Sequence, residues 1–290
     1  LKGKNVQHLL SVDDMNESFI FDLWSKAIDQ KDTFSSVLNN KILTNLFYEP
    51  STRTSSSFYS AMVRQGGSVI PINNVKFSSA IKGESLEDTI ITMGTMSDCI
   101  VLRHPEIGSA IKASKVSSVP IINAGDGEGE HPTQTLLDGF TIYFNNKNNI
   151  DNLKITMVGD LKNGRTVKSL VKLLSRYSGN HFNFVSPSDL KFPKISLPKN
   201  SFETENIEDV ISDTDVLYVT RVQTERGSDH QYSLTIDQLD LLPEKSIVMH
   251  PLPRVNEIPR AFDNNIRAKY FEQMTYGLWC RMALLEDFMS

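Results

Sequence analysis

A group of hydroxyl and guanidinium side chains follows the apolar segment 41–47. It consists of Ser51, Thr52, Arg53 and Thr54, at the start of a predicted helix that runs to about Gln65. Backbone N–H groups at a helix start favour anions, hydroxyls add donors, and a guanidinium group matches the geometry of phosphate. The segment is therefore either a phosphate-binding helix start or an ordinary serine cap beside a surface arginine.

Three more polar groups come after predicted strands in the first half of the chain. They are Ser78 with Lys82, then Arg103, and then His131 with Gln134. Ligands of open parallel sheets bind outside the carboxyl ends of strands, so Arg103 is expected beside Arg53. The alternatives are a solvated surface lysine at 82, a loop ion pair at 103 and a structural hydrogen bond at 131.

The second half carries cationic and amide side chains after its own predicted strands. They are Arg165, Arg221, Gln223 and Arg226, followed by the proline-rich segment 250–254. Arg165, Arg221 and Gln223 would suit a substrate with carboxylates. The two prolines of that segment make a stiff loop that exposes backbone carbonyls, and these could accept hydrogen bonds from an amine.

One segment nearly matches a nucleotide-binding P-loop. Residues 159–166 read GDLKNGRT, with a predicted strand before them and a predicted helix after them. The P-loop lysine is replaced by Arg165, and no convincing strand ends in a magnesium-binding Asp. We therefore expect no P-loop here.

Composition excludes several classes of protein. The chain has 290 residues, a net charge of −5 and no apolar run of membrane-spanning length, so we expect neither a broad nucleic-acid surface nor a membrane span. Two cysteines at 99 and 280 give no metal motif and suit a reducing compartment. A cytoplasmic protein is expected, and targeting upstream of Leu1 stays open.

The order of apolar segments predicts an α/β fold with two domains, each a mostly parallel sheet flanked by helices. Predicted strands cover 41–47, 68–72, 99–102, 119–122, 154–158, 182–185, 216–220 and 246–249. Predicted helices start at Asn16, Ser51, Ser85, Pro132 and Thr166, a final helix covers 270–290, and 191–200 reads as loop. One domain is expected to hold 1–133 with 270–290, and the other 134–269.

Taken together, these segments resemble the catalytic chains of the aspartate carbamoyltransferase family. The motifs that carry the resemblance are EPSTRT (49–54), KGE (82–84), RHP (103–105), NAGDG (123–127), HPTQT (131–135), VGDLK with GRT (158–166), TRVQ with ER (220–226) and HPLPR (250–254). They occur in the order and spacing of the family and cover nearly the whole chain.

The resemblance implies transfer of the carbamoyl group of carbamoyl phosphate to the α-amine of L-aspartate, an early step of pyrimidine synthesis. It places phosphate on residues 51–54 and Arg103, and the carbonyl oxygen near Thr54, Arg103 and His131. It places the carbamoyl amide near Gln134 and aspartate on Arg165, Arg221 and Gln223, with the carbonyls of Pro251 and Leu252 meeting the amine and carbamoyl groups.

The resemblance also implies an assembly. Ser78 and Lys82 are expected to reach the site of a neighbouring subunit, which makes a homotrimer with shared sites the minimal active unit. Glu49 is expected to pair with Arg165 and Arg226 when the site closes. No metal or other cofactor is implied, and a regulatory partner stays unknown.

Two other functions stay open beside this one. An ornithine carbamoyltransferase shares the phosphate and His-Pro-Thr-Gln motifs, but a cationic substrate would meet like charge at Arg165 and Arg221. A non-catalytic assembly module is disfavoured because every expected catalytic side chain is present. Serines follow the phosphate motif at 55–57, where many relatives have an arginine or another bulky residue, and Asn256 stands where bacterial relatives often have Asp. Neither departure removes an expected catalytic group.

Overall fold

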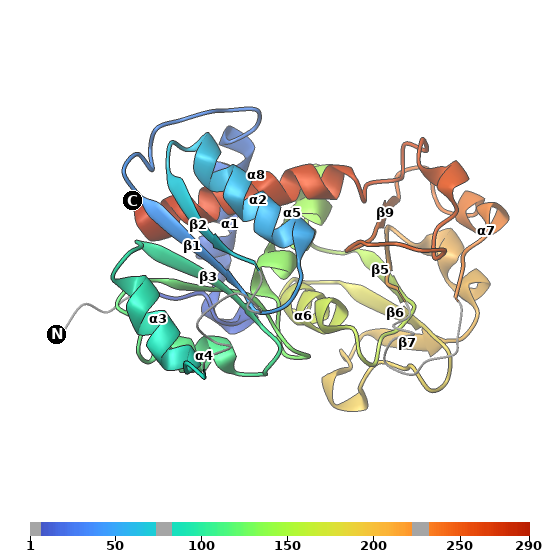
Figure 1. Ribbon diagram of the computed structural model, residues 1–290. Coiled ribbons are helices and arrows are strands. Elements are labelled where there is room, and N and C mark those ends of the chain that lie inside the picture. Colours follow the sequence, from blue (N-terminus) through green and yellow to red (C-terminus); the bar gives the residue numbers. More distant parts are fainter. Residues whose placement is uncertain (1–6, 74–82, 222–231) are drawn as a thin grey trace. The chain divides into compact units, whose positions relative to one another are not determined.

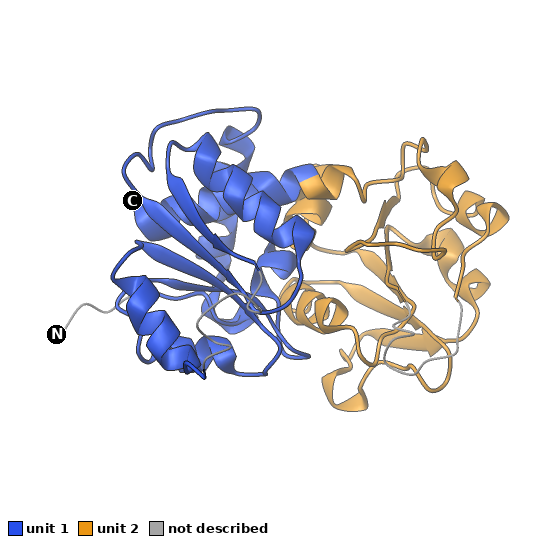
Figure 2. Cartoon of the chain, in the orientation of Figure 1, with its two compact units in different colours: residues 1–137, 275–290 blue, residues 138–274 orange. Residues whose placement is uncertain are grey.

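The computed structural model describes residues 7–73, 83–221 and 232–290. The chain divides into two compact units, one of residues Leu1–Leu137 with Thr275–Ser290 and the other of Asp138–Met274 (Figure 2). These limits lie a few residues from the expected ones at 133/134 and 269/270. Helices α5 (Pro132–Asn145) and α8 (Glu272–Met289) carry the chain from one unit to the other.

Unit 1 is built on a parallel sheet of four strands in the order β2-β1-β3-β4. Its strands are β1 (Ile42–Phe47), β2 (Ser68–Ile72), β3 (Cys99–His104) and β4 (Ile121–Asp126). The chain passes from β1 to β2 on one side and then crosses to β3 on the other. The strand order therefore reverses between β1 and β3, and this switch point is where parallel sheets bind ligands.

Helices cover both faces of this sheet (Figure 1). They are α1 (Glu17–Asp29), α2 (Thr52–Arg64), α3 (Leu86–Gly94) and α4 (Ser109–Ser114), with the unit 1 parts of α5 and α8. Helices α3 and α4 bury Ile90, Ala110 and Ala113 against side chains of β1, β3 and β4. Helix α8 packs against α2, where the Gln65 amide donates to the Met282 carbonyl at 3.0 Å.

The start of α1 and the end of α2 show how the local sequence determines where a helix begins and ends. Asn16 caps the start of α1, because its side-chain oxygen accepts from the Phe19 N–H at 2.8 Å. After the end of α2, Gly66 adopts φ +84°, a conformation that glycine reaches without strain. The chain then turns back into β2. A Cβ at Gly67 would lie 2.1 Å from the methyl group of Met62, so a side chain there would require the Met62 side chain to move.

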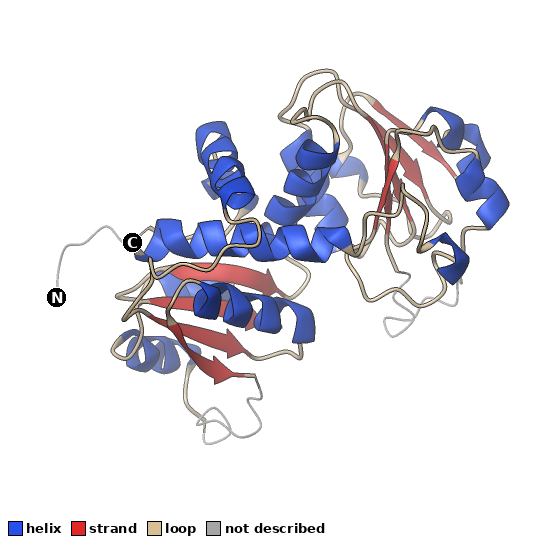
Figure 3. Ribbon diagram, turned by 90° about the horizontal axis from the view of Figure 1, so that it is seen from above, coloured by secondary structure: helices blue, strands red, loops and turns tan. Residues whose placement is uncertain are grey.

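Unit 2 holds a second sheet, drawn in Figures 1 and 3. It is parallel and has five strands in the order β7-β6-β5-β8-β9. Its strands are β5 (Lys154–Val158), β6 (His181–Val185), β7 (Ser201–Thr204), β8 (Val216–Val219) and β9 (Ile247–Met249). Its other helices are α6 (Arg165–Leu174) and α7 (Ile236–Asp240). The order reverses between β5 and β8, which makes this the switch point of unit 2. Strands from both sides of that point bury apolar side chains in one core cluster.

The expected α/β class with two parallel sheets is confirmed, and the differences concern short elements. Helices α4 and α7 and strand β7 have no counterpart among the expected elements. Strand β4 runs to Asp126, four residues beyond the expected end at 122. Short 3₁₀ helices occupy Val12–Asp14, Lys194–Ser196, Ile207–Asp209, Ile211–Asp213 and Arg260–Phe262, so the segment 191–200 is not entirely loop.

Candidate active site

The start of helix α2 follows the carboxyl end of β1. Ser51 occupies the N-cap position, but its side chain makes no capping hydrogen bond to the helix. Thr54 in the first turn is buried, whereas Thr52 and Arg53 are exposed. The ordinary-cap interpretation requires a hydroxyl bonded to the helix, so this geometry favours the anion-binding interpretation.

Arg103 lies near the end of strand β3, directly across the switch point from β1. Its backbone carbonyl accepts from the Tyr48 N–H at 2.8 Å, which fixes the loop after β1 against the end of β3. The guanidinium Nε lies 3.3 Å from Glu49 Oε2, and Nη1 donates to the Ala124 carbonyl at 3.5 Å. Burial lowers the pKa of Arg103 and Glu49 partly offsets that effect, so the group stays cationic at neutral pH.

Glu49 therefore has a partner inside unit 1. Arg103 forms the loop ion pair that the sequence left open as one alternative, and this pair lies at the switch point. The family resemblance implies Arg165 and Arg226 as partners of Glu49 instead. Arg226 lies outside the described residues, and pairing of Glu49 with Arg165 stays a prediction for the closed enzyme.

His131 and Gln134 follow strand β4 and lie at the start of helix α5. Both side chains are buried, at 4% and 7% exposure. The His131 carbonyl accepts from the N–H groups of Gln134 and Thr135 at 3.0 and 3.1 Å, so His131 takes the cap position of the helix. Its ring Nδ1 lies 3.3 Å from Thr133 Oγ1. This contact holds the imidazole plane at the helix start.

Unit 1 thus collects its predicted site residues at the ends of neighbouring strands. The hydroxyl and arginine group follows β1, Arg103 lies at the end of β3, and His131 with Gln134 follows β4. Ser78 and Lys82 come after β2 in the chain and lie outside the described residues.

In unit 2, Arg165 and Arg221 follow the two strands that flank the switch point. Arg165 is the first residue of α6, Arg221 follows β8, and both are half-buried. Gly159 has φ +114°, and a Cβ there would lie 2.4 Å from the Thr220 carbonyl. This glycine lets the two strand ends approach closely. Gln223, the other predicted aspartate ligand, lies outside the described residues.

The loop between β5 and α6 does not act as a phosphate loop in this structure. Asp160 is fully buried, and its Oδ1 accepts from the Asn163 N–H at 3.0 Å. The Asn163 side-chain amide also donates to both Asp160 oxygens, at 3.2 and 3.1 Å. A carboxylate bonded inside the loop disfavours phosphate there, in agreement with the sequence argument against a P-loop.

The loop after β9 has a constrained backbone. Leu252 adopts φ +49°, which is uncommon for a non-glycine residue, and the Leu252–Pro253 bond is cis. The Leu252 N–H donates to His250 Nδ1 at 2.8 Å, and the His250 N–H donates to Gln273 Oε1 at 3.2 Å. The bond at the Leu252 N–H fixes the peptide plane that carries the Pro251 carbonyl. Residues held in sparsely populated backbone conformations cluster at functional sites.

His104, which the sequence named only as part of a motif, supports the same region of unit 1. Its ring lies 4.6 Å from the Tyr48 ring between centroids, and its Nδ1 accepts from the Glu106 N–H at 3.0 Å. Burial lowers the pKa of His104 and so favours the neutral imidazole. The sequence alone could not show whether His104 supports the site or takes part in catalysis.

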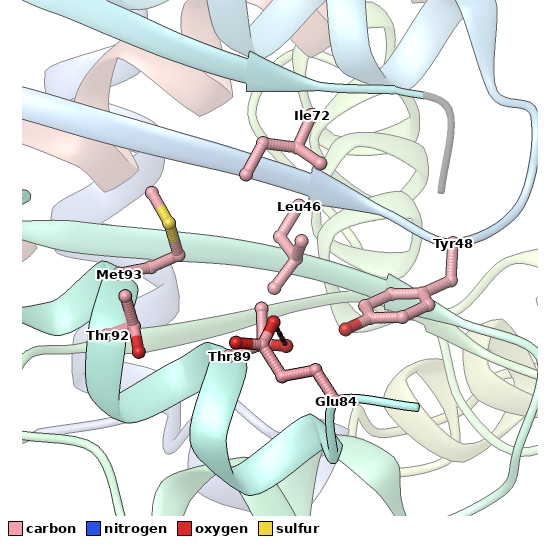
Figure 4. A pocket seen from close by; sticks show the side chains of 7 residues that line it. All are labelled: Leu46, Tyr48, Ile72, Glu84, Thr89, Thr92 and Met93. Carbon is pink, nitrogen blue, oxygen red and sulfur yellow. Dashed lines mark hydrogen bonds between the residues drawn. The ribbon is translucent and has the colours of Figure 1, made fainter. Parts of the chain in front are cut away.

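A cavity of about 130 Å³ lies in unit 1 beside Tyr48 (Figure 4). Its lining consists of Leu46, Tyr48, Ile72, Glu84, Thr89, Thr92 and Met93. The Thr89 hydroxyl donates to Glu84 Oε2 at 2.8 Å across one side. None of these residues belongs to the predicted site.

Two kinds of feature are missing from residues 7–73, 83–221 and 232–290. No helix in these ranges is long and apolar enough to cross a membrane. The same ranges hold no group of three or more histidine, cysteine or acidic side chains placed to bind a metal ion.

Two family models match the chain in succession. Residues 7–144 match the carbamoyl-phosphate-binding domain of aspartate/ornithine carbamoyltransferases, and residues 151–288 match the aspartate/ornithine-binding domain. A curated relative from Thermoplasma volcanium, named aspartate carbamoyltransferase catalytic subunit, is 47% identical over 303 residues and covers 98% of each chain. One from Clostridium novyi with the same name is 46% identical over 301 residues, covering 98% of this chain and 97% of the relative.

Solved structures agree with these matches. An aspartate transcarbamoylase from Trypanosoma cruzi, in complex with carbamoyl aspartate and phosphate, superposes with a TM-score of 0.91 at 39% identity, covering 98% of this chain and 96% of the other. The catalytic subunit of M. jannaschii aspartate transcarbamoylase gives a TM-score of 0.90 at 44% identity and 98% coverage of both chains.

Proposed function

Because this chain belongs to the aspartate/ornithine carbamoyltransferase family, we propose that it transfers the carbamoyl group of carbamoyl phosphate to the α-amine of L-aspartate. The products are N-carbamoyl-L-aspartate and phosphate. One observation carries the proposal: each unit gathers anion-binding side chains at the switch point of its own parallel sheet. Two separate anionic substrates require two such clusters.

Unit 1 binds carbamoyl phosphate in this proposal. The α2 start with Ser51, Thr52, Arg53 and Thr54 holds the phosphate, and Arg103 adds a second guanidinium. Glu49 now pairs with Arg103, so phosphate competes with that carboxylate for the arginine. His131, Thr54 and Arg103 donate to the carbonyl oxygen, and Gln134 binds the carbamoyl amide.

Unit 2 binds L-aspartate. Arg165 and Arg221 each pair with a carboxylate, since a guanidinium group binds carboxylates in a bidentate geometry. Gln223 adds an amide contact. The carbonyls of Pro251 and Leu252 accept from the amine, which orients its lone pair toward the carbamoyl carbon.

The reaction needs no covalent intermediate with the enzyme. The neutral amine attacks the carbamoyl carbon, the C–N bond forms, and negative charge develops on the carbonyl oxygen. The C–O bond to phosphate then breaks, phosphate leaves with the bonding electrons, and the amine loses a proton. Positioning two polyanions and stabilising the developing oxyanion with fixed donors supply the rate enhancement.

The deciding experiment offers the purified chain carbamoyl phosphate with L-aspartate and, in parallel, with L-ornithine. We expect carbamoylaspartate and phosphate in equal amounts, and no citrulline above background. Citrulline as the main product would assign the ornithine reaction instead. No product with either amine, from a chain that is folded by circular dichroism, would favour the non-catalytic assembly module.

We also propose that the active unit is a homotrimer in which Ser78 and Lys82 complete the site of a neighbouring subunit. Both residues follow β2 in the chain. Strand β2 lies beside β1, and β1 leads into the proposed phosphate-binding residues 51–54, which we call the phosphate cluster. A shared site predicts complementation. Mixed trimers of Lys82→Ala and Arg53→Ala chains should regain activity, since some hybrid sites contain both native residues. Size-exclusion chromatography with light scattering measures the assembly.

Lack of recovery, with hybrid trimers confirmed by mass spectrometry, would show that each site lies within one chain. The control mixes each variant with itself, which should give no recovery.

We further assign the reaction to pyrimidine synthesis in the cytoplasm. The two buried free thiols at Cys99 and Cys280 support a reducing compartment.

A further inference from the structure

A buried carboxylate in unit 2 has no part in the function described above. Asp138 on α5 has 0% exposure. Its Oδ2 accepts from the Tyr218 hydroxyl of β8 at 2.7 Å, and its Oδ1 accepts from the side-chain amide of Gln273 on α8 at 2.5 Å. Tyr218 and Gln273 are also fully buried. A carboxylate is tolerated in such a place only when strong donors compensate its lost hydration.

The amide of Gln273 extends this network to the loop after β9. Its Nε2 donates to Asp138, and its Oε1 accepts from the backbone N–H of His250 at 3.2 Å. The two partners fix the orientation of the amide, because a backbone N–H cannot accept and a carboxylate cannot donate. The carboxylate of Asp138 therefore determines which end of the Gln273 amide donates and which end accepts.

The chain of bonds continues into the substrate loop. His250 Nδ1 accepts from the Leu252 N–H at 2.8 Å, and Leu252 is the residue at φ +49°. A left-handed conformation at leucine costs free energy and persists only where its surroundings hold it. The bonds from Gln273 to the backbone of His250, and from His250 to Leu252, supply that support.

Tyr218 also donates to Asp138, and it lies on β8, whereas Gln273 lies on α8. Burial and the nearby Asp138 carboxylate raise the pKa of Tyr218 well above its usual value. The phenol therefore remains a donor throughout the neutral range. Tyr218 stabilises the carboxylate, whereas Gln273 connects it to the loop.

We propose that Asp138 and Gln273 are positioning residues for the amine substrate, acting through the backbone of His250 to set the carbonyls of Pro251 and Leu252. This inference rests on the proposed binding of L-aspartate by that loop. It predicts that a disturbed network raises the KM for aspartate more than the KM for carbamoyl phosphate. The residues proposed to bind the phosphate and the carbonyl oxygen of carbamoyl phosphate belong to unit 1, and only its carbamoyl amide is expected to meet this loop.

A double-mutant cycle tests the network. Gln273→Glu places two carboxylates in contact with each other, so it should raise the KM for aspartate about 10-fold. Asp138→Asn alone should change it less than threefold, since the oxygen of the new amide can still accept from Gln273.

The double variant, Asp138→Asn with Gln273→Glu, should restore both bonds of the side chain at position 273. The bond between positions 138 and 273 then runs in the opposite direction, with position 138 as the donor. The new amide at position 138 donates to the new carboxylate at position 273, and the other oxygen of that carboxylate accepts from the His250 N–H. The KM for aspartate should therefore return to within threefold of wild type.

Tyr218→Phe is the matched control for a purely structural role. It removes one hydrogen bond from the same carboxylate, so the melting temperature should fall while both KM values stay within twofold. If Gln273→Glu does not fold, Gln273→Met replaces it and should raise the KM for aspartate similarly. Wild-type KM values in folded Gln273 variants, equal rises for both substrates, or no rescue in the double variant would overturn the inference.

The proposed function fails separately from this inference. Absence of carbamoylaspartate formation by the wild-type chain would refute the proposed function. An active wild type whose variants do not follow the cycle would refute only the positioning role.

Discussion

Arg53→Ala is expected to lower kcat by at least ~10²–10³-fold, the loss that follows removal of one preorganised donor to a developing charge. Arg53 lies in the first turn of α2 and its side chain is exposed, so little packing is lost in the alanine variant. The positive charge and fork of donors for the leaving phosphate disappear together. Steady-state rates of carbamoylaspartate formation measure the effect, and circular dichroism checks the fold.

Arg64→Ala serves as the matched control for this variant. Arg64 is the last residue of the same helix, and its guanidinium lies over the Phe34 ring at 4.8 Å. Removing it deletes the same charge from α2 at the opposite end from the phosphate cluster. We expect turnover within twofold of wild type. Equal losses in the two variants would indicate a general charge effect and reject a direct role for Arg53.

His131→Asn is expected to lower kcat about 10²-fold, with a smaller change in the KM for carbamoyl phosphate. The imidazole is buried at the start of α5 and contacts Thr133, so its position is fixed before substrate binds. Asparagine keeps a polar group there but cannot place a donor at the same reach. The variant therefore loses a hydrogen bond that stabilises the developing oxyanion more than it stabilises the bound substrate. Loss of such a bond lowers kcat more than it raises KM.

The control for this residue is His181→Asn at the first position of β6. It makes the same substitution in unit 2, at a residue that has no part in the proposed binding of either substrate. Its kinetic constants should stay within twofold of wild type. A His131→Asn enzyme with wild-type kcat would remove His131 from the mechanism and leave Arg103 and Thr54 as the donors to the carbonyl oxygen.

The longer elements follow from the sequence because their patterns are local. The apolar runs at 41–47 and 154–158 read as buried parallel strands, and both strands lie inside their sheets. The type and position of Asn16 predict a helix cap, and its hydrogen bond to Phe19 confirms that prediction. Short elements escape detection. Helix α4 has six residues and β7 has four, too few to show a hydrophobic period.

By itself, the sequence determined which side chains follow which strands, and therefore the chemistry that each strand end carries. Only the tertiary structure decided that β1 lies beside β3 and β5 beside β8, which brings separate strand ends to two switch points. It also decided that Asp138 meets Gln273 across 135 positions of the chain. Strand order and buried polar pairing depend on which surfaces pack against one another, and no local pattern of residue types encodes that choice.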